Sequence, residues 1–205
     1  MIFIMDRHKR GMETMDAIYG RRSVRKYLPD PVPEDKMRML MEAGCRAASA
    51  LNAQGVSFAV VTDRDRVTEY GERGKKKTLE EWRGSERMNP HVERILTSER
   101  SVIFHRAPAL IFLFTSPECY LPVEDASLVA GNIMTAAEDA GLGTCWIGLA
   151  QGLNGDPDFR RELGIPDDRT LRATITVGYP EVRETVPKEK NAPVIHGWIR
   201  QAGIS

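Results

Sequence analysis

The stretch Arg21-Arg22-Ser23-Val24-Arg25-Lys26-Tyr27 places three guanidinium groups, one ammonium group and a serine hydroxyl close together. Arg presents a planar set of N–H donors that matches phosphate oxygens two at a time, and Ser adds a compact donor. Pro29, Pro31 and Pro33 follow, so the chain should leave a short helix here and continue as an extended segment. This arrangement suits a small phosphorylated ligand, although it lacks the glycine spacing of a Walker loop.

Two other interpretations of the basic stretch remain open at this point. Adjacent Arg residues often form an ordinary solvated surface, and they also occur in nucleic-acid-binding proteins. The whole chain is not basic, because 29 Lys and Arg residues balance 29 Asp and Glu residues. It also has no long basic stripe interleaved with aromatic residues, which single-strand binders use. We therefore expect a small ligand and no nucleic-acid partner.

Length and composition predict one domain of ordinary size. The chain has 205 residues, of which 41% are hydrophobic, which is enough for a substantial core. The apolar start, Met1 to Met5, is too short for a signal peptide, and the longest apolar run, Ala107 to Thr115, has the length of a strand. Three cysteines without disulfide or metal spacing fit a reducing compartment. We expect a cytoplasmic protein without a membrane partner, with residues 1–13 as an N-terminal arm.

Hydrophobic periodicity predicts a mixture of helices and four short strands. Helices are expected from Thr14 to Arg21, from Pro33 to about Ala48, from Pro122 to about Gly141, and from Asp156-Pro157 onward. Strands are expected at Ser57–Thr62, Ala109–Thr115, Thr144–Leu149 and Leu171–Val177. The third helix has a stripe of small and apolar residues that suits a buried central helix or a dimer contact. These elements predict an α+β sandwich.

The segment from Arg64 to about Arg100 is highly charged and prone to form helix. Gly84 and Pro90 should interrupt it. Its sequence is compatible with a mobile lid or with an inserted pair of helices.

Two further segments carry chemistry that a ligand could use. Ser49-Ala50-Leu51-Asn52-Ala53-Gln54 offers amide donors and acceptors that match a heterocycle edge, although an ordinary polar helix-to-strand loop is the better explanation of this segment taken alone. Gly141-Leu142-Gly143-Thr144-Cys145-Trp146-Ile147-Gly148 contains glycines that let a flat ligand approach the backbone. The latter does not have the spacing of a dinucleotide-binding fingerprint.

The usual signatures of protein-borne catalysis are absent from the sequence. The four histidines are scattered without metal-ligand spacing, and neither His-Glu-x-x-His nor Gly-x-Ser-x-Gly occurs. No pair of carboxylates stands out as a general acid and base. We therefore expect no metal site, and the sequence shows no equipment for nucleophilic or metal-dependent hydrolysis.

Five motifs in a fixed order give the chain a recognisable resemblance. They are Arg-Arg-Ser-x-Arg-x-aromatic, Ser-x-x-Asn-x-Gln, Asp-x-x-Leu-x-x-x-Asn-x-Met, Gly-Leu-Gly-Thr-Cys-Trp-Ile-Gly and Val-Gly-Tyr-Pro. The third of these comprises Asp125, Leu128, Asn132 and Met134. From about Met15 to the tail, this sequence resembles the FMN-dependent nitroreductase family.

The resemblance implies a nitroreductase-like three-layer α/β/α sandwich and an intertwined homodimer. It also implies two equivalent clefts at the dimer interface, each holding FMN. Residues 14–205 would form one FMN-binding domain, with a variable helical region near 64–106 that shapes the pocket above the flavin. A C-terminal extension would follow near 181–205.

The same resemblance implies roles for individual residues. Arg21 and Ser23 would hold the phosphate with Arg22 beside them, and Arg25 would reach the ribityl chain and the N1–C2=O edge. The flavin ring would be contacted by the Ser-x-x-Asn-x-Gln residues Ser49, Asn52 and Gln54, and by the backbone of Trp146, Ile147 and Gly148 near N5. A basic residue in the tail would return to the phosphate, with Lys188 and Lys190 as candidates.

The implied function is an FMN-dependent oxidoreductase. NADH or NADPH would give hydride to flavin N5, and a small-molecule electron acceptor such as a nitroaromatic or a quinone would then bind in the same place in a ping-pong cycle. Alternatives within the fold are a flavin-fragmenting or dehalogenating enzyme. A non-catalytic FMN-binding carrier or sensor is a further alternative.

Overall fold

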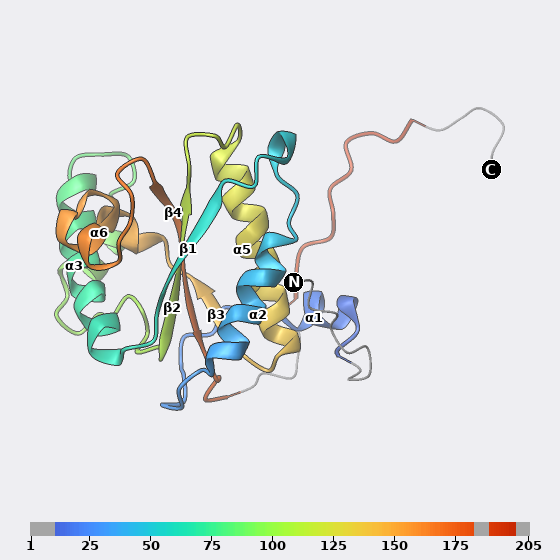
Figure 1. Cartoon of the computed structure of the whole chain (residues 1–205), viewed down its shortest axis with the longest axis horizontal. Helices are drawn as coiled ribbons and strands as arrows, with labels where there is room; N and C mark the ends of the chain where they lie inside the picture. The colour runs from blue at the N-terminus through green and yellow to red at the C-terminus, as the bar shows by residue number, and fades with distance from the viewer. Residues whose placement is uncertain (1–10, 183–188, 200–205) are drawn as a thin grey trace.

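A computed structural model describes residues 11–182 and 189–199, which form a four-stranded antiparallel sheet with helices on both faces (Figure 1). The strands are β1 (Val56–Val61), β2 (Ala109–Thr115), β3 (Gly143–Trp146) and β4 (Thr170–Gly178). Their order in the sheet is β1-β2-β4-β3, so β2 and β4 are central. The predicted α+β, three-layer sandwich is confirmed. Residues 1–10 of the predicted arm and residue Lys188 lie outside the described residues, and the division into domains stays a prediction.

Strand β2 explains why both faces of the sheet are covered. All seven of its residues are buried, and side chains alternate between the two faces of a strand. Ala109, Ile111 and Leu113 join one hydrophobic core, whereas Leu110 and Phe112 join the other. A strand that is apolar on both sides needs an apolar layer on each side.

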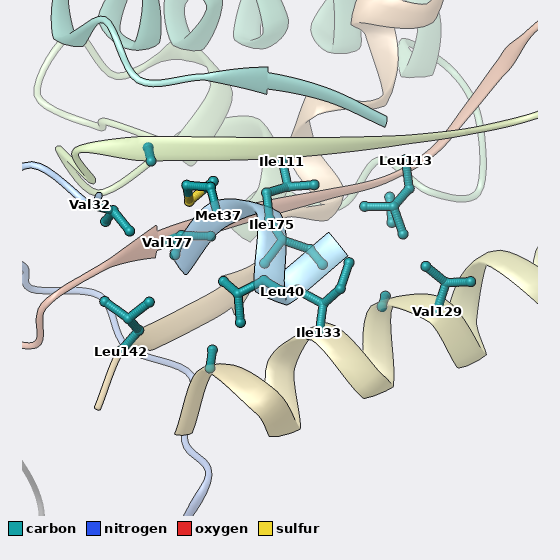
Figure 2. Close-up of a cluster of buried hydrophobic side chains, with 14 residues drawn as sticks. Val32, Met37, Leu40, Ile111, Leu113, Val129, Ile133, Leu142, Ile175 and Val177 are labelled. Atoms are coloured by element: carbon teal, nitrogen blue, oxygen red, sulfur yellow. The ribbon is translucent and has the colours of Figure 1, made fainter. Parts of the chain in front are cut away.

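The first layer consists of α1 (Thr14–Gly20), α2 (Glu34–Cys45) and α5 (Pro122–Asp139). Figure 2 shows Val129 and Ile133 of α5 and Leu40 of α2 facing Ile175 and Ile111 of the sheet. Gly44 lets the two helices approach closely, because a Cβ there would lie 2.9 Å from Cγ1 of Ile133. The predicted apolar stripe of α5 is therefore the side that packs on the sheet and α2.

The second layer consists of α3 (Arg64–Trp82), α4 (Pro90–Thr97), a 3-10 segment η2 (Gly148–Gly155) and α6 (Pro157–Glu162). Figure 1 shows α3 and α6 on the side of the sheet opposite α2 and α5. The interruptions predicted near Gly84 and Pro90 are confirmed. Val67 and Tyr70 of α3 are buried in the second core, so α3 is a packed helix of the sandwich and not a lid.

The strand predicted at Thr144–Leu149 is shorter than expected. Pairing ends at Trp146, although the N–H of Ile147 still donates to the carbonyl of Thr174 at 2.8 Å. The chain then coils into η2, whose Gly152 N–H donates to Oγ1 of Thr78 at 2.9 Å. Close packing against α3 thus overrides the local strand pattern. Among the helices of the described ranges, none has the length and apolar character needed to cross a bilayer.

Lys75 connects α3 to the chain that follows α4. Its side chain is buried, and Nζ donates to the carbonyls of Ser98 and Ser101, each at 2.9 Å, and to Oε2 of Glu72 at 3.2 Å. These three acceptors satisfy the three donors of an ammonium group. Lys75 therefore holds the segment between α4 and β2 against α3.

We expect Lys75→Met to lower the free energy of unfolding by about 1–3 kcal/mol, because it removes the donor from two carbonyl groups while it keeps a long apolar side chain. Denaturant unfolding measures this loss, with Lys76→Met as the control because Lys76 is exposed one residue further along α3. Equal midpoints for the two variants would contradict the structural role of Lys75.

Candidate functional site

A cavity of about 480 Å³ lies at the C-terminal end of α5. It is lined by the whole segment from Gly20 to Lys26, which we call the basic loop, by Glu138, Gly141, Leu142 and Gly143, and by Pro180, Val182 and Lys190. Five of the predicted site residues, Arg21, Arg22, Ser23, Arg25 and Lys190, thus face the same space. Lys190 lies more than 160 residues from the other four in the sequence, and the fold brings it beside them.

The basic loop is fixed to the edge of the sheet by backbone hydrogen bonds. Ser23 forms a parallel bridge with Thr144 of β3, and the N–H of Val24 donates to the Thr144 carbonyl at 2.9 Å. Further along, the N–H of Leu28 donates to the carbonyl of Tyr179 at 2.8 Å. The loop therefore lies along β3 and the residues that follow β4.

Gly143 allows this close approach. A Cβ at position 143 would lie 2.5 Å from Cγ2 of Val24, a separation that side chains do not adopt without a shift of the neighbouring atoms. The sequence marked Gly143 as a place for a flat ligand to approach the backbone. The structure shows that the group in close contact with it is the basic loop itself.

The cations of the basic loop differ in what they contact. Arg22 donates from Nη1 to the carbonyls of Tyr19 and Arg21, each at 2.7 Å, so it binds the end of α1, and its Nε has no partner in the described residues. Within residues 11–182 and 189–199, no carboxylate forms an ion pair with Arg21 or Arg25. Arg21 and Arg25 therefore contribute positive charge to the cavity that nearby acidic groups of the described chain do not neutralise by direct pairing.

The positive charge of Arg25 influences the pKa values of two other groups, the partly buried His105 and the buried Cys145. Burial lowers the pKa of His105, and the nearby Arg25 lowers it further. Burial raises the pKa of the Cys145 thiol, and the positive charge of Arg25 opposes this rise. His105 and Arg106 both have positive φ, at 55° and 54°, in the turn that leads to β2. His105 and Arg106 thus have a backbone conformation that non-glycine residues seldom adopt.

The predicted Ser49–Gln54 segment lies at the other end of α5. The N–H of Ala50 donates to Oδ1 of the buried Asp125 at 2.8 Å, in the first turn of that helix. Asp125 and Glu138 are separated by about 20 Å along α5, at about 1.5 Å per residue. Within one chain, therefore, Ser49, Asn52 and Gln54 do not join the cavity at the basic loop.

The Ser49–Gln54 segment has an unusual backbone that exposes its polar groups. Leu51, Asn52 and Gln54 have φ values of 53°, 56° and 50°, in the left-handed region. Oγ of Ser49 accepts a hydrogen bond from the N–H of Gln54 at 3.1 Å. The side chains of Asn52 and Gln54 are exposed. Strain of this kind in an exposed, amide-bearing loop is typical of binding segments.

Trp146, Ile147 and Gly148 lie at the end of β3 and just after it, and they do not line the cavity. Ile147 is buried, and its N–H is used by the sheet. Gly148 is exposed, and a Cβ there would have no heavy atom within 4 Å. Of these three positions, Gly148 leaves room for a flat group against the backbone. Lys190 lines the cavity, whereas Lys188 lies outside the described residues.

Three residues contribute to the site in ways that the sequence did not predict. Gly143 sets the distance between the loop and the sheet, Tyr27 ties the loop to β4, and Asp125 holds the Ser49–Gln54 segment. Asp125 and Tyr27 belong to quoted motifs, so their positions carried a signal without a role. Within the described residues, no group of three or more His, Cys, Asp or Glu side chains could hold a metal ion.

We expect Gly143→Ala to lower the free energy of unfolding by about 1–3 kcal/mol, because the added methyl group overlaps Val24 and displaces the basic loop. Gly155→Ala is the matched control, since a Cβ at Gly155 meets nothing within 4 Å. Denaturant unfolding of both variants gives the comparison. A Gly143→Ala protein as stable as Gly155→Ala would show that the loop moves away without cost.

Comparisons with known proteins agree with this architecture. The sequence pattern of the nitroreductase family matches residues 18–179. A crystal structure of a nitroreductase with bound FMN from Bacteroides fragilis superposes with a TM-score of 0.77, at 25% identity, over 93% of this chain and 100% of that one.

Two sequence relatives show how varied the matched proteins are. The chain is 25% identical to an NADPH-flavin oxidoreductase of Vibrio harveyi, over 89% of this chain and 72% of the relative. It is also 25% identical to an iodotyrosine deiodinase of Thermotoga neapolitana, over 81% of this chain and 88% of the relative. The family pattern spans most of the chain and includes both the basic loop and β4. The chain belongs to the nitroreductase family.

Proposed function

We propose that this protein binds FMN at the basic loop and works as a homodimeric oxidoreductase that uses NADH or NADPH. The observation that carries the proposal is the convergence of Arg21, Ser23, Arg25 and Lys190 on one cavity. These side chains supply bidentate and single donors of the type that binds phosphate. Because the cations line a cavity instead of a flat stripe, a small anionic ligand is favoured over nucleic acid.

The residues present fit FMN. The cavity of about 480 Å³ lies in the size range of small-molecule sites. Arg21 and Ser23 would bind the phosphate, and Arg25 would place a positive charge beside the carbonyl edge of the ring system. Lys190 would add a point charge from the tail. When bound, FMN would supply two-electron redox chemistry, which accounts for the lack of catalytic side chains in the sequence.

The separation of the two halves of the site supports a dimer. In one chain, about 20 Å of α5 separates Asp125, which holds the Ser49–Gln54 segment, from the cavity at the basic loop. A ligand bound at the basic loop can contact Asn52 only if a second copy presents its own Ser49–Gln54 segment there. A twofold dimer would form two such composite sites, because the same contact occurs twice.

Exposed apolar side chains provide a second argument for a partner copy. Met15, Ile18 and Tyr19 on α1 and Leu128 on α5 are at least half exposed. The tail from residue 189 to 199 is exposed throughout and extends away from the sandwich in Figure 1, with apolar side chains at Val194, Ile195, Trp198 and Ile199. Apolar surface of this extent is typical of an interaction face. We propose that it packs on the second copy.

Several classes of electron acceptor are compatible with an FMN-dependent oxidoreductase of this family. A nitroaromatic or a quinone is our first expectation. Reductive dehalogenation is a second candidate, because an iodotyrosine deiodinase matches this chain over 81% of its length, at the same identity as the flavin oxidoreductase. The α3–α4 region gives no further distinction between these substrates. A carrier or sensor would bind FMN without transferring electrons to either.

The first test is the absorption spectrum of the purified protein with and without added FMN. We expect a two-banded flavin spectrum that bleaches on anaerobic addition of NADH or NADPH and returns when a nitroaromatic or a quinone is added. Recovery only with an iodinated tyrosine, after reduction by dithionite, would favour dehalogenation. A protein that binds FMN but recovers with no acceptor would be a carrier, and a protein that binds no FMN would refute the proposal.

The second test asks whether the site is shared between subunits. Arg21→Ala should weaken FMN binding by about 1.5–3 kcal/mol, the usual size for a hydrogen bond to a charged group. Asn52→Ala should weaken it from the other side of the same composite site. A mixed dimer of the two variants, purified through two different tags, would contain one intact site and one doubly altered site. At an FMN concentration that leaves both parent variants mostly empty, we expect about one flavin per mixed dimer.

The control for this test is Arg161→Ala, which removes an exposed cation from α6 on the opposite layer and should leave FMN binding unchanged. A mixed dimer that binds no more flavin than its parents would place both halves of the site in one chain and refute the shared arrangement.

A further inference from the structure

The hydroxyl of Tyr27 lies between the basic loop and the centre of the sheet. It donates to the carbonyl of Val24 at 2.7 Å and lies 2.7 Å from Oγ1 of Thr176 on β4. Oγ1 of Thr176 is also 3.2 Å from the carbonyl of Cys145 on β3. A chain of hydroxyl groups therefore connects the loop to both strands beside it.

The number of hydrogens on the two hydroxyl groups determines which of these groups donates and which accepts. The two hydroxyl groups have one hydrogen each. Because the Val24 carbonyl can only accept, the Tyr27 hydrogen goes to it, and Thr176 is then left to donate to the Tyr27 oxygen or to the Cys145 carbonyl. Thr176 is fully buried, so it cannot exchange these partners for water. Removal of either hydroxyl would leave a carbonyl or a hydroxyl without its partner.

Burial keeps the Tyr27 hydroxyl in its donating form. Desolvation raises the pKa of Tyr27, and this effect outweighs the opposing influence of the Thr176 hydrogen bond and of Arg25. A neutral phenol retains the hydrogen that the Val24 carbonyl accepts. The contact is therefore present throughout the physiological pH range.

The Val24 carbonyl belongs to the peptide group that joins Val24 to Arg25. Ser23 and Arg25 flank Val24 and line the cavity, whereas Tyr27 itself does not. The side chain of Val24 is held at Gly143, and its N–H is bound to Thr144. With its carbonyl held by Tyr27, every polar and apolar group of Val24 is fixed, and so is the direction in which the chain enters Arg25.

We propose that Tyr27 is a positioning residue for the binding loop, acting through the Val24 carbonyl to orient Arg25 toward the bound ligand. The inference rests on the proposed FMN site, but it concerns a side chain that does not touch the ligand. It predicts that loss of one buried hydroxyl weakens ligand binding at a distance.

The test compares Tyr27→Phe with Tyr70→Phe. Both changes remove one hydrogen-bonded hydroxyl, from the partly buried Tyr27 and from the buried Tyr70, but the Tyr70 hydroxyl donates to Oε2 of Glu162 at 2.9 Å, in the opposite layer of the sandwich. Flavin fluorescence titration gives the FMN dissociation constant, and denaturant unfolding gives stability. We expect Tyr27→Phe to weaken FMN binding by about 5–30-fold, which lies within the range for leaving a buried acceptor without its donor, and Tyr70→Phe by less than about 2-fold.

A double-mutant cycle separates positioning from general destabilisation. If Tyr27 acts through Arg25, the effect of Tyr27→Phe on FMN binding should shrink to less than about 2-fold when Arg25 is already Ala. A purely structural role would give the same fold-change in both backgrounds. Thr176→Val provides an independent variant that breaks the same chain, and Thr176→Ser should restore binding because it keeps the hydroxyl.

The outcomes distinguish this inference from the proposed function. Wild-type protein that binds FMN, with Tyr27→Phe and Tyr70→Phe equally affected, would overturn the positioning role and leave the FMN site intact. Equal fold-changes with Arg25 and with Ala at position 25 would overturn it as well. Wild-type protein without affinity for FMN would refute the site on which both claims depend.

Discussion

The two-sided burial of the central strands is the constraint on which the rest of the structure depends. Every residue of β2 is buried, and its side chains feed two separate hydrophobic cores. Helices must therefore cover both faces, and α5 spans one of them with its stripe of small apolar residues (Figure 2). The length of α5 then separates its ends by more than the width of a small ligand. One end carries the basic loop, and the other carries the Ser49–Gln54 segment.

Backbone hydrogen bonds and the packing of the Val24 side chain against Gly143 hold the loop that lines the cavity. The basic loop reaches the edge of β3 because Gly143 has no side chain, and backbone bonds to Thr144 and Tyr179 hold it there. Nη1 of Arg22 donates to the carbonyls of Tyr19 and Arg21 at the end of α1, so Arg22 stabilises the turn that contains Arg21. Arg21 and Arg25 line the cavity beside Arg22, and neither forms an ion pair with a carboxylate of the described residues. Arginines that are neighbours in the sequence therefore make different contacts in the fold.

The sequence predicted elements well where one local pattern dominates. The apolar run of β2 and the stripe of α5 are confirmed because burial on both faces and helical periodicity are readable from a few neighbouring residues. The strand expected to continue to Leu149 is wrong after Trp146, because packing of η2 against Thr78 is a contact between distant segments. The basic loop was identified from donor chemistry alone, and Lys190 was one of two candidates. The roles of Gly143 and Tyr27 could not be predicted, because they depend on which strand lies behind the loop.

The proposed dimer would explain why the predicted site residues fall into two separate groups within a single chain. Residues that contact one flat ligand need not be close within one subunit, since twofold symmetry can place the end of one α5 beside the opposite end of its partner. The exposed apolar residues of α1 and the tail mark surface that a lone subunit leaves in water at a cost. If both features belong to one interface, dimerisation and ligand binding are thermodynamically coupled. FMN would then stabilise the dimer by the same free energy with which the dimer strengthens FMN binding.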